Sequence, residues 1–512
     1  MLIAAFMTAA CWWQIVTTCS VSEHHVTLGD MFSIDGGSDH AFTLTSVFED
    51  CDEFPAYTLI CGEERPMRIE SIMVKQIDLN IRGTPYKKKS LSALVFKEHS
   101  ICKWQLVFKN KILTGPYSFP SRALDNSKPL SMAIIADMDL TDNSKETVAR
   151  LMVLQEQDFD LLMHIGDFAY EIEDDGGQKG DDFFQQMSKV TKYIPYIVTP
   201  GNHENFANGS LFNYRFRMPN TGNDPTNNRQ NHLYDLFIKG VYLITLNFDY
   251  ILQLRPDDFI DSLNWVEDRL KLVQNNPDVR WKVFFSHRPI ICNDLVFTRD
   301  CSANLYILKA FDDLFIKYNL TIVLNGHLHI YSRLHPFHDF KIMPFDKTGN
   351  GTYLQIISGH SGTEHYFPGI NATGLYDYPF VDKVDLSGPT YMSVQVSRDY
   401  FDGKLLLSED NSVLDDFSFK CPKTRKVPHW VYPLIIGLAV VFFSIVVLLM
   451  VQYLRRMSDA DQKLRNELEI KLIPEHKGQS VGLDYLENKL TLQSHQHGSD
   501  TSPESRGCQG HR

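Results

Sequence analysis

The sequence predicts a central α/β domain, preceded by a small all-β domain and followed by one membrane-spanning helix. Five short apolar runs in the middle of the chain lack polar alternation, which is typical of strands buried on both faces. The residues before them have strand and turn patterns without helical periodicity, and a long apolar stretch lies near the C-terminus. A chain of 512 residues is too long for one hydrophobic core, so two folded domains are expected.

The N-terminal residues 1–20 have the pattern of a signal peptide. An apolar stretch (LIAAFMTAACWW) is followed by the small residues Thr18-Cys19-Ser20, which indicates a cleavage site near there. From Val26 to Ser121 the runs FTLTSVF, YTLICG, SALVFK and WQLVFK read as strands. We therefore expect a β-sandwich domain at residues 21–121, followed by a linker in PSRALDNSKP.

Helices are expected between the central strands. Asn143 and Glu146 have capping-box spacing ahead of VARLMVLQ. DSLNWVEDRLKLV and LYILKAFDDLFIKY have helical spacing on either side of KVFFSH, and YLITLNFDY and TYLQIISG add strands. This alternation predicts an α/β domain at residues 130–407 with its helices outside.

Each of the five apolar runs ends in a residue that can bind a metal ion. The runs LSMAIIAD, LLMHIGD, PYIVTPGN, KVFFSH and TIVLNGH end at Asp137, Asp167, Asn202, His287 and His327. Tyr170, His203 and His329 follow a few residues beyond these ends. Each motif alone has a structural explanation, because Gly-Asp and Gly-Asn form turns and a histidine often ends a strand. Ligand sites form beyond the carboxyl ends of such strands, so the set as a whole predicts a two-metal hydrolase.

The C-terminal region predicts a membrane anchor. Val431 to Val451 is an uninterrupted apolar stretch, long enough to cross a bilayer, and we expect a transmembrane helix at residues 431–452. Basic residues flank both ends, so they favour a cytosolic C-terminus only slightly. Four N-x-S/T glycosylation acceptors precede the span: Asn208, Asn319, Asn350 and Asn371. The expectation is a single-pass type I protein at the cell surface or in a lysosome or vacuole. Its main domain would be extracellular or lumenal, with a stalk at residues 408–430 and a disordered cytoplasmic tail at residues 453–512.

An oxidising compartment would favour disulfides among the cysteines. Of nine cysteines, Cys11 and Cys19 are expected to leave with the signal peptide, and Cys508 would be cytosolic. Six remain: Cys51, Cys61, Cys102, Cys292, Cys301 and Cys421. Cys292 with Cys301 is the favoured pair because they close a short loop. Cys51 with Cys61 is a second candidate, which leaves Cys102 and Cys421.

The motifs Asp137-Met138-Asp139, GDFAY, PGNHE, SHRP and GHLH, in this order, resemble those of the purple acid phosphatases, a branch of the calcineurin-like metallophosphoesterases. The likeness is closer to the long animal and plant members and covers about residues 130 to 375. It implies a metallophosphoesterase β-sandwich flanked by helices, preceded by a fibronectin III-like domain. The implied function is that of a membrane-anchored acid phosphatase that hydrolyses phosphate monoesters.

The resemblance also implies a role for each site residue. Asp137, Tyr170 and His329 would hold Fe(III), Asp167 would bridge both ions, and Asn202, His287 and His327 would complete a site for Zn, Fe or Mn as the divalent ion. The donor chemistry agrees, because carboxylates and a phenolate suit a trivalent ion, whereas imidazoles and a neutral amide suit a divalent one. His203 would protonate the leaving alkoxide or bind the phosphate, or else orient a ligand.

The chain departs from the family pattern at three positions. Ala136 and Asp139 stand where the family has glycine, and Ser332 replaces a common glutamate. An Asp139 side chain turned toward the metals would weaken phosphate binding, so Asp139→Gly is expected to lower the KM.

Two alternative functions stay open. One is a phosphodiesterase or nucleotide phosphohydrolase on the same site, and the other is a surface binding protein that has lost turnover. The net charge of −13 argues against a nucleic-acid partner, so small phosphate esters are the expected partners. The sequence does not predict an oligomeric state.

Overall fold

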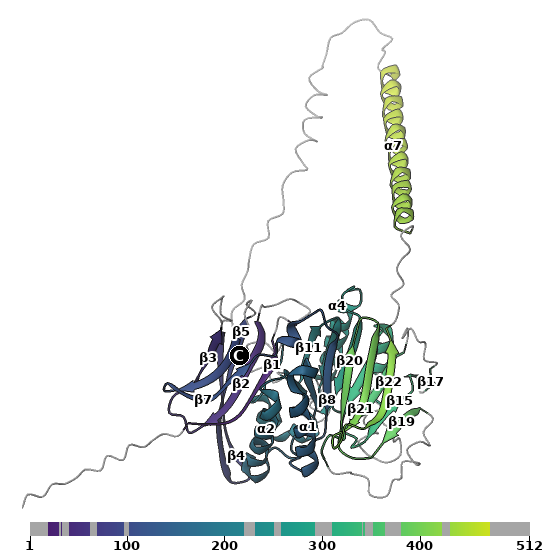
Figure 1. Ribbon diagram of the computed structural model, residues 1–512. Coiled ribbons are helices and arrows are strands. Elements are labelled where there is room, and N and C mark those ends of the chain that lie inside the picture. Colours follow the sequence, from purple (N-terminus) through teal and green to yellow (C-terminus); the bar gives the residue numbers. More distant parts are fainter. Residues whose placement is uncertain are drawn as a thin grey trace, which may run out of the picture. The chain divides into compact units, whose positions relative to one another are not determined.

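The computed structural model describes residues 19–29, 32, 40–61, 69–96, 102–219, 231–249, 258–291, 310–339, 341–343, 352–363, 380–421 and 431–471. The chain divides into two compact units, Met1–Lys423 and Thr424–Arg512. The first unit holds all the sheets in the described residues (Figure 1), and it contains His203 and the seven predicted metal ligands.

The N-terminal part of the first unit is all-β. A four-stranded sheet has the order β1-β2-β5-β4, a three-stranded sheet has the order β3-β6-β7, and every pairing is antiparallel. The strands are β1 (Ser20–Leu28), β2 (His40–Glu49), β3 (Ala56–Cys61), β4 (Ile69–Ile81), β5 (Thr84–Phe96), β6 (Cys102–Phe108) and β7 (Lys111–Ser118). The four strands predicted here are confirmed as β2, β3, β5 and β6. The finer likeness to a fibronectin III domain stays a prediction.

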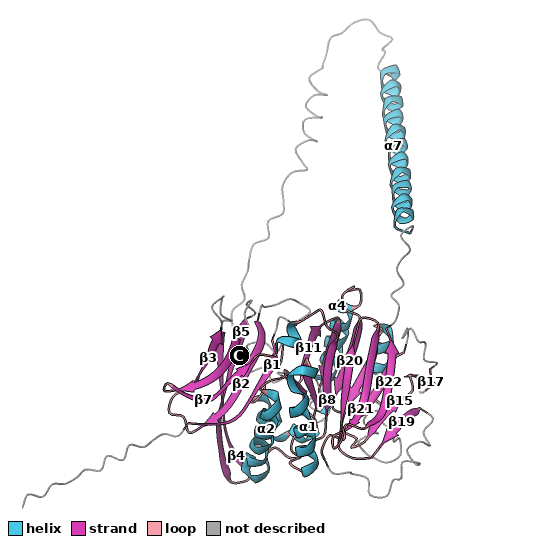
Figure 2. Ribbon diagram, viewed as in Figure 1, coloured by secondary structure: helices cyan, strands magenta, loops and turns pink. Residues whose placement is uncertain are grey.

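A six-stranded sheet with the order β10-β9-β8-β20-β21-β22 forms one layer of the central domain (Figure 2). Its strands are β8 (Leu130–Ile135), β9 (Leu161–Ile165), β10 (Tyr196–Thr199), β20 (Thr390–Val396), β21 (Tyr400–Leu407) and β22 (Val413–Lys420). The strands β8, β9 and β10 run parallel and the others antiparallel. The helices α1 (Asp142–Asp158) and α2 (Gln178–Thr191) connect the parallel strands, as the alternating pattern predicts.

A seven-stranded sheet with the order β11-β12-β13-β14-β18-β15-β19 forms the other layer. Its strands are β11 (Leu233–Ile238), β12 (Val241–Leu246), β13 (Trp281–Ser286), β14 (Ile322–Asn325), β18 (Leu354–Ser358), β15 (Tyr331–Leu334) and β19 (Val381–Asp385). The four central strands β12, β13, β14 and β18 are parallel. A short ribbon joins β16 (Phe337–His338) and β17 (Lys341–Ile342). The predicted helix over DSLNWVEDRLKLV is confirmed as α4 (Phe259–Val273), and residues 310–317 are helical.

The two sheets share one core, and the second sheet is buried on both faces. On β13, Val283 and Phe285 belong to the same apolar cluster as Ile134 of β8. The intervening Phe284 belongs to a second cluster, together with Val266 of α4. Successive strand residues therefore pack against the facing sheet and against the helices, which explains the absence of polar alternation. The short remaining helices are η2 (Ser121–Leu124), η3 (Asp174–Gly177), η4 (Asn202–Glu204), η5 (Phe206–Gly209) and α3 (Ser210–Asn213).

The cap of α1 differs from the prediction. The helix begins at Asp142, so Asn143 lies inside it and cannot be the N-cap residue. The backbone N–H of Ser144 instead donates to Thr141 Oγ1 at 3.2 Å. Thr141 therefore satisfies one of the free N–H groups of the first turn, and the predicted capping box is wrong.

A disulfide joins Cys19 to Cys51. The two cysteines flank the antiparallel β1–β2 pair, in which Ser20 lies opposite Glu49. The expectation that Cys19 leaves with the signal peptide is therefore wrong, and a cleavage that keeps this bond must precede Cys19. The pairing of Cys51 with Cys61 is also wrong.

The remaining cysteine expectations have different outcomes. Cys421 is buried, and the described residues show no disulfide between it and Cys102. Cys292 and Cys301 lie outside the described residues.

The predicted stalk at 408–430 is wrong in its first part. Residues 413–420 form β22 at the edge of the six-stranded sheet, paired with β21. Phe417 and Phe419 are buried, while Ser418 between them and Lys420 after them are exposed. The folded domain therefore extends to Cys421, and residues 422–430 lie outside the described part.

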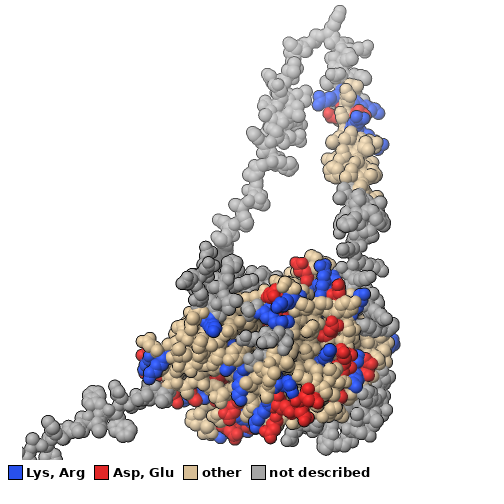
Figure 3. All heavy atoms as spheres, viewed as in Figure 1, with Lys and Arg blue, Asp and Glu red and all other residues tan. Residues whose placement is uncertain are grey.

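The second unit contains the helix α7 (Val431–Lys471). Among the described residues, α7 is the one helix that is long and apolar enough to cross a membrane. The apolar part spans Gly437–Asn466 and has a mean hydropathy of 2.4. Figure 3 shows an uncharged stretch of α7 followed by a charged one. The tail was expected to be disordered, but its residues 453–471 are helical. Their acidic and basic side chains form i,i+4 pairs, such as Asp461 with Arg465, which stabilise a helix.

Candidate metal centre

The predicted site residues converge at the carboxyl ends of the parallel strands. Asp137 follows β8, Asp167 follows β9, Asn202 begins η4 after β10, and His287 and His327 follow β13 and β14. Ligand atoms of Asp167, His287 and His327 all lie within 4.8 Å of one another. The two sheets thus deliver their polar strand ends to one place, as the sequence predicts.

The three residues expected to hold Fe(III) contact one another. The Tyr170 hydroxyl donates to Asp137 Oδ1 at 2.9 Å and lies 2.6 Å from His329 Nε2. His329 Nε2 is 3.6 Å from Asp137 Oδ1. The structure therefore groups a carboxylate, a phenol and an imidazole around one small volume.

Three of the four residues expected at the second ion, Asp167, His287 and His327, are also close together. His287 Nε2 lies 3.1 Å from Asp167 Oδ2, and His287 Nδ1–H donates to the carbonyl oxygen of Ile165 at 2.9 Å. That bond turns Nε2 toward the site, as in many histidine metal ligands. Asn202 Oδ1 is buried and has no hydrogen-bond partner among the described residues. A buried amide oxygen without a partner costs about 1–3 kcal/mol, so its position fits a cation.

The electrostatics of the metal-free site also fit two cations. Burial raises the pKa of Asp137 to about 8. Burial opposes the charge of His287, but the carboxylates of Asp167 and Asp137 raise its pKa to about 10. Burial, and then the charge of Asp137, raises the pKa of Tyr170 well above its usual value. In the metal-free protein, protons therefore occupy Asp137, His287 and Tyr170, and cations would displace them.

Close approach explains two glycines of the motifs. A Cβ added to Gly201 would lie 2.2 Å from Asp167 Oδ1, and one added to Gly326 would lie 2.5 Å from Asp137 Oδ2. Four of the predicted metal ligands have left-handed backbone conformations: Asp137, Asp167, Tyr170 and His327, with φ of 56°, 53°, 37° and 71°. Such conformations in non-glycine residues cost about 1–3 kcal/mol each and cluster at functional sites.

Glu204 is a supporting residue that the sequence reasoning missed. Its carboxylate accepts the backbone N–H groups of Asp167 (3.0 Å), Phe168 (2.9 Å) and Gly201 (2.6 Å). These bonds join the segment after β9 to the segment after β10 and fix both. The glutamate directly after His203 in the PGNHE motif was the available signal.

Arg288 and Asp249 form a second support that was missed. Asp249 Oδ1 accepts two N–H groups of Arg288, at 2.9 and 2.6 Å. Arg288 Nη1 lies 3.2 Å from His327 Nε2, so the guanidinium restricts the rotation of this imidazole. The arginine of the SHRP motif thus orients a neighbouring ligand candidate.

His203 lies at the partly open edge of the site. Its side chain is 27% exposed, its Nδ1 lies 2.7 Å from Glu171 Oε1, and its Nε2 lies 3.7 Å from Asp167 Oδ2. Burial lowers the pKa of His203, but the hydrogen bond to Glu171 and the charge of Asp167 outweigh burial and raise it to about 9. In the metal-free protein at neutral pH the imidazole of His203 is therefore in its protonated, positively charged form beside the site.

The Asp139 carboxylate forms an ion pair with Lys179. Asp139 Oδ1 lies 3.1 Å from Lys179 Nζ and accepts the N–H of Leu140 at 2.7 Å. Lys179 therefore compensates the charge of Asp139, and the expected effect of Asp139→Gly on the KM stays a prediction. Ser332 lies buried in β15.

Two of the glycosylation acceptors, Asn208 and Asn319, are exposed. Asn350 and Asn371 lie outside the described residues.

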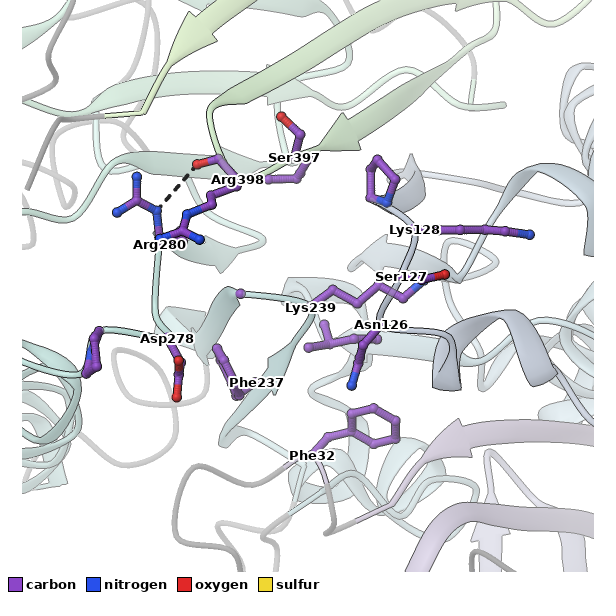
Figure 4. Close-up of a pocket in the computed structure, with 15 residues that line it drawn as sticks. Phe32, Asn126, Ser127, Lys128, Phe237, Lys239, Asp278, Arg280, Ser397 and Arg398 are labelled. Carbon is purple, nitrogen blue, oxygen red and sulfur yellow. Dashed lines mark hydrogen bonds between the residues drawn. The ribbon is translucent and has the colours of Figure 1, made fainter. Parts of the chain in front are cut away.

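A cavity of about 630 Å³ lies at the opposite strand ends (Figure 4). Its lining includes Pro129, Gly240 and Arg280, which directly precede β8, β12 and β13. Lys239, a further lining residue, pairs with Asp160 at 2.8 Å. Because the site residues gather at the carboxyl ends of these strands, this cavity is separate from the candidate metal centre.

Comparisons with known proteins agree with the site. A family model for the calcineurin-like phosphoesterases matches residues 130–331. Acid phosphatase type 7 of Homo sapiens is 27% identical over 311 residues, 56% of this chain and 69% of that protein. Purple acid phosphatase 21 of Arabidopsis thaliana is 23% identical over 223 residues, 42% of this chain and 47% of that protein.

A solved structure shows the same fold. Purple acid phosphatase PPD1 from yellow lupin seeds matches with a TM-score of 0.59 at 15% identity, over 79% of this chain and 75% of that one. The chain thus contains a calcineurin-like phosphoesterase domain and is similar to the purple acid phosphatases.

Proposed function

We propose that this protein is a membrane-anchored acid phosphatase that hydrolyses phosphate monoesters at a centre of Fe(III) and a divalent ion. The observation that carries the proposal is the Tyr170 hydroxyl, which lies 2.9 Å from Asp137 Oδ1 and 2.6 Å from His329 Nε2. A phenol held between a carboxylate and an imidazole is a donor set suited to Fe(III). The names of the relatives, acid phosphatase and purple acid phosphatase, support the same activity.

Seven residues would hold the two ions. Asp137, Tyr170 and His329 would bind Fe(III), Asn202, His287 and His327 would bind Zn, Fe or Mn as the divalent ion, and Asp167 would bridge them. When bound, the ions supply Lewis acidity toward phosphate oxygens and water. The protein supports this arrangement with the three backbone bonds to Glu204 and with the contact of Arg288 to His327.

His203 is the proposed general acid. It holds a proton beside Asp167, while Glu171 binds its other ring nitrogen and fixes the direction of the ring. A protonated imidazole at the open edge of the site would donate its proton to the leaving alkoxide. Nearby cations lower the pKa of His203 from its metal-free value, which brings it closer to an acidic working pH.

The proposed topology is type I, with the first unit extracellular or lumenal, at the cell surface or in a lysosome or vacuole. The Cys19–Cys51 disulfide supports an oxidising compartment, and α7 would be the anchor. The exposed acceptors Asn208 and Asn319 support glycosylation of this unit. Acidic and basic side chains are interspersed on the face in Figure 3, which favours small phosphate esters over nucleic acid as partners.

The test is metal analysis of the full-length protein in detergent, together with hydrolysis of aryl phosphate monoesters and diesters from acidic to neutral pH. We expect iron plus a second metal, and faster monoester turnover at acidic pH. Faster diester turnover would favour the phosphodiesterase alternative. Fully metallated protein without turnover of either ester would favour the binding-protein alternative and refute the proposal.

A further inference from the structure

The segments that leave β8 and β9 run side by side toward the metal centre. The N–H of Asp137 donates to the carbonyl oxygen of Gly166 at 3.1 Å, and that of Met138 donates to Asp167 at 3.1 Å. The N–H of Ala169 then donates back to Met138 at 2.8 Å. Among the described residues, this is where backbone bonding between the two segments ends, one residue before Tyr170.

Lys179 makes the next connection with its side chain. Its Nζ donates to the carbonyl oxygen of Tyr170 at 2.6 Å and lies 3.1 Å from Asp139 Oδ1. Lys179 and Asp139 side chains are 21% and 25% exposed, so water screens their attraction only partly. One ammonium group thus ties the segment that carries Tyr170 to the segment that carries Asp137.

The segment that Lys179 holds is conformationally strained. Ala169 and Tyr170 have φ of 64° and 37°, in the left-handed region that non-glycine residues rarely adopt. Such a backbone persists only when surrounding contacts hold it. The bond from Lys179 to the Tyr170 carbonyl acts directly at the strained residue.

The position of Lys179 is unfavourable for its own helix. It is the second residue of α2, and the partial positive charge at a helix N-terminus disfavours a cation there. A residue that violates the local preference of its element is expected mainly where it has a functional role. The Asp139 carboxylate and the Tyr170 carbonyl compensate this placement.

The start of α2 is also well anchored. Asp181, two residues after Lys179, accepts hydrogen bonds from the Tyr86 hydroxyl and from Arg215 Nη2, both at 2.6 Å. Lys88 Nζ lies 3.0 Å from the second Asp181 oxygen. These partners come from β5 and from the segment after α3, so Lys179 projects from a fixed platform.

From these contacts we propose that Lys179 is a positioning residue of the metal centre, which holds Tyr170 in place for Fe(III) by joining its carbonyl to Asp139. The proposal rests on the function proposed above and adds to it a residue outside the ligand set. It also gives Asp139 a role, as the counter-charge that keeps Lys179 over the Tyr170 carbonyl.

The test compares Lys179→Met, Lys179→Arg and Asp139→Asn in the full-length protein in detergent. Supporting contacts of metal ligands typically change metal affinity by about 10- to 100-fold. We expect Lys179→Met to weaken Fe(III) binding by about this factor and to shift the phenolate-to-iron absorption band. Lys179→Arg, which keeps the donor and the charge, should restore most of the affinity, and Asp139→Asn should show a smaller loss than Lys179→Met.

The matched control is Lys145→Met. Lys145 is an exposed partner of Asp142 at 2.9 Å near the start of α1, so its loss should leave Fe(III) binding and the band unchanged. Wild-type Fe(III) affinity and an unshifted band in Lys179→Met would overturn the proposal.

Failure of the proposed function has a different signature. If the wild type shows neither the absorption band nor monoester turnover, the assignment as a ferric phosphatase fails. Lys179 is then tested by calorimetric titration of the metal-free protein with zinc(II). Equal zinc affinity in the wild type and in Lys179→Met would overturn the positioning role as well.

Discussion

Replacing the buried Glu23 by Gln should change how the stability of the metal-free protein depends on pH. Glu23 is 1% exposed, and its Oε1 accepts a hydrogen bond from Arg215 Nε at 2.8 Å. Burial outweighs the attraction of Arg215 and raises the pKa of Glu23 from 4.5 to about 7. The difference between these values, about 2.5, corresponds to about 3 kcal/mol at 1.36 kcal/mol for each pH unit.

The sign follows from the raised value. Because the pKa of Glu23 is higher in the folded than in the unfolded protein, its stabilising contribution is complete below pH 4.5 and is lost as the pH rises to about 7. Glu23→Gln removes this titration. The free energy of unfolding of the variant relative to the wild type should therefore increase by about 3 kcal/mol between about pH 4 and about pH 8.

The assay is urea unfolding of both full-length proteins in detergent and chelator, followed by tryptophan fluorescence. Other titrating groups cancel in the comparison, because they are common to both proteins. Glu409→Gln, at an exposed position after β21, is the control and should show no pH-dependent difference from the wild type. A stability difference between Glu23→Gln and the wild type that is constant across pH would refute the reasoning.

Three further substitutions test the supports of the site. Glu171→Gln should move the basic limb of the kcat–pH profile to lower pH. Burial lowers the pKa of His203 and the hydrogen bond to the Glu171 carboxylate raises it, so loss of that carboxylate should lower the pKa. An unmoved limb would contradict a general acid at His203. Arg288→Met should weaken calorimetric zinc binding by about 10- to 100-fold, because His327 loses its orienting contact; an unchanged Kd would count against that role. Glu204→Gln should lower the free energy of unfolding by about 1–3 kcal/mol, since an amide cannot accept all three N–H groups. Urea unfolding measures this change, and equal stability would show that these bonds contribute little.

The convergence of the site residues was predictable because it follows from topology. Within each sheet the parallel strands end at the same edge, so Asp137 meets Asp167 after β8 and β9, and His287 meets His327 after β13 and β14. Sequence order and strand character were sufficient for each pair, and the packing of the two sheets on one core brings the two pairs together. The resemblance then supplied the expected role of Tyr170.

The supporting contacts were not predictable in the same way. Lys179 and Asp139 contact each other but are 40 residues apart in the sequence, and no single motif contains both of them. Asp249 contacts Arg288 only because β12 and β13 are adjacent parallel strands. Such pairs depend on tertiary packing, which a single sequence does not encode in local periodicity.

The edges of the domain were the least predictable parts. β22 carries Asp415 and Asp416 among its apolar residues and therefore resembles a polar stalk. In the fold, Asp415 accepts hydrogen bonds from Tyr331 at 2.7 Å and from Arg333 at 2.9 Å. The Asp415 carboxylate, which the sequence predicts to be solvent-exposed, thus pairs with β15 of the neighbouring sheet. The Cys19–Cys51 bond was missed for a related reason, since it depends on the register of β1 against β2.

The most direct test of the central claim is the visible spectrum of the purified full-length protein, with its metal content, in the wild type and in Tyr170→Phe. The Tyr170 hydroxyl contacts both Asp137 and His329, so phenolate-to-iron charge transfer should colour the wild type. In Tyr170→Phe the band should vanish while the protein stays folded. A band of equal intensity in Tyr170→Phe, or a fully metallated wild type without iron, would contradict a ferric site built on Tyr170.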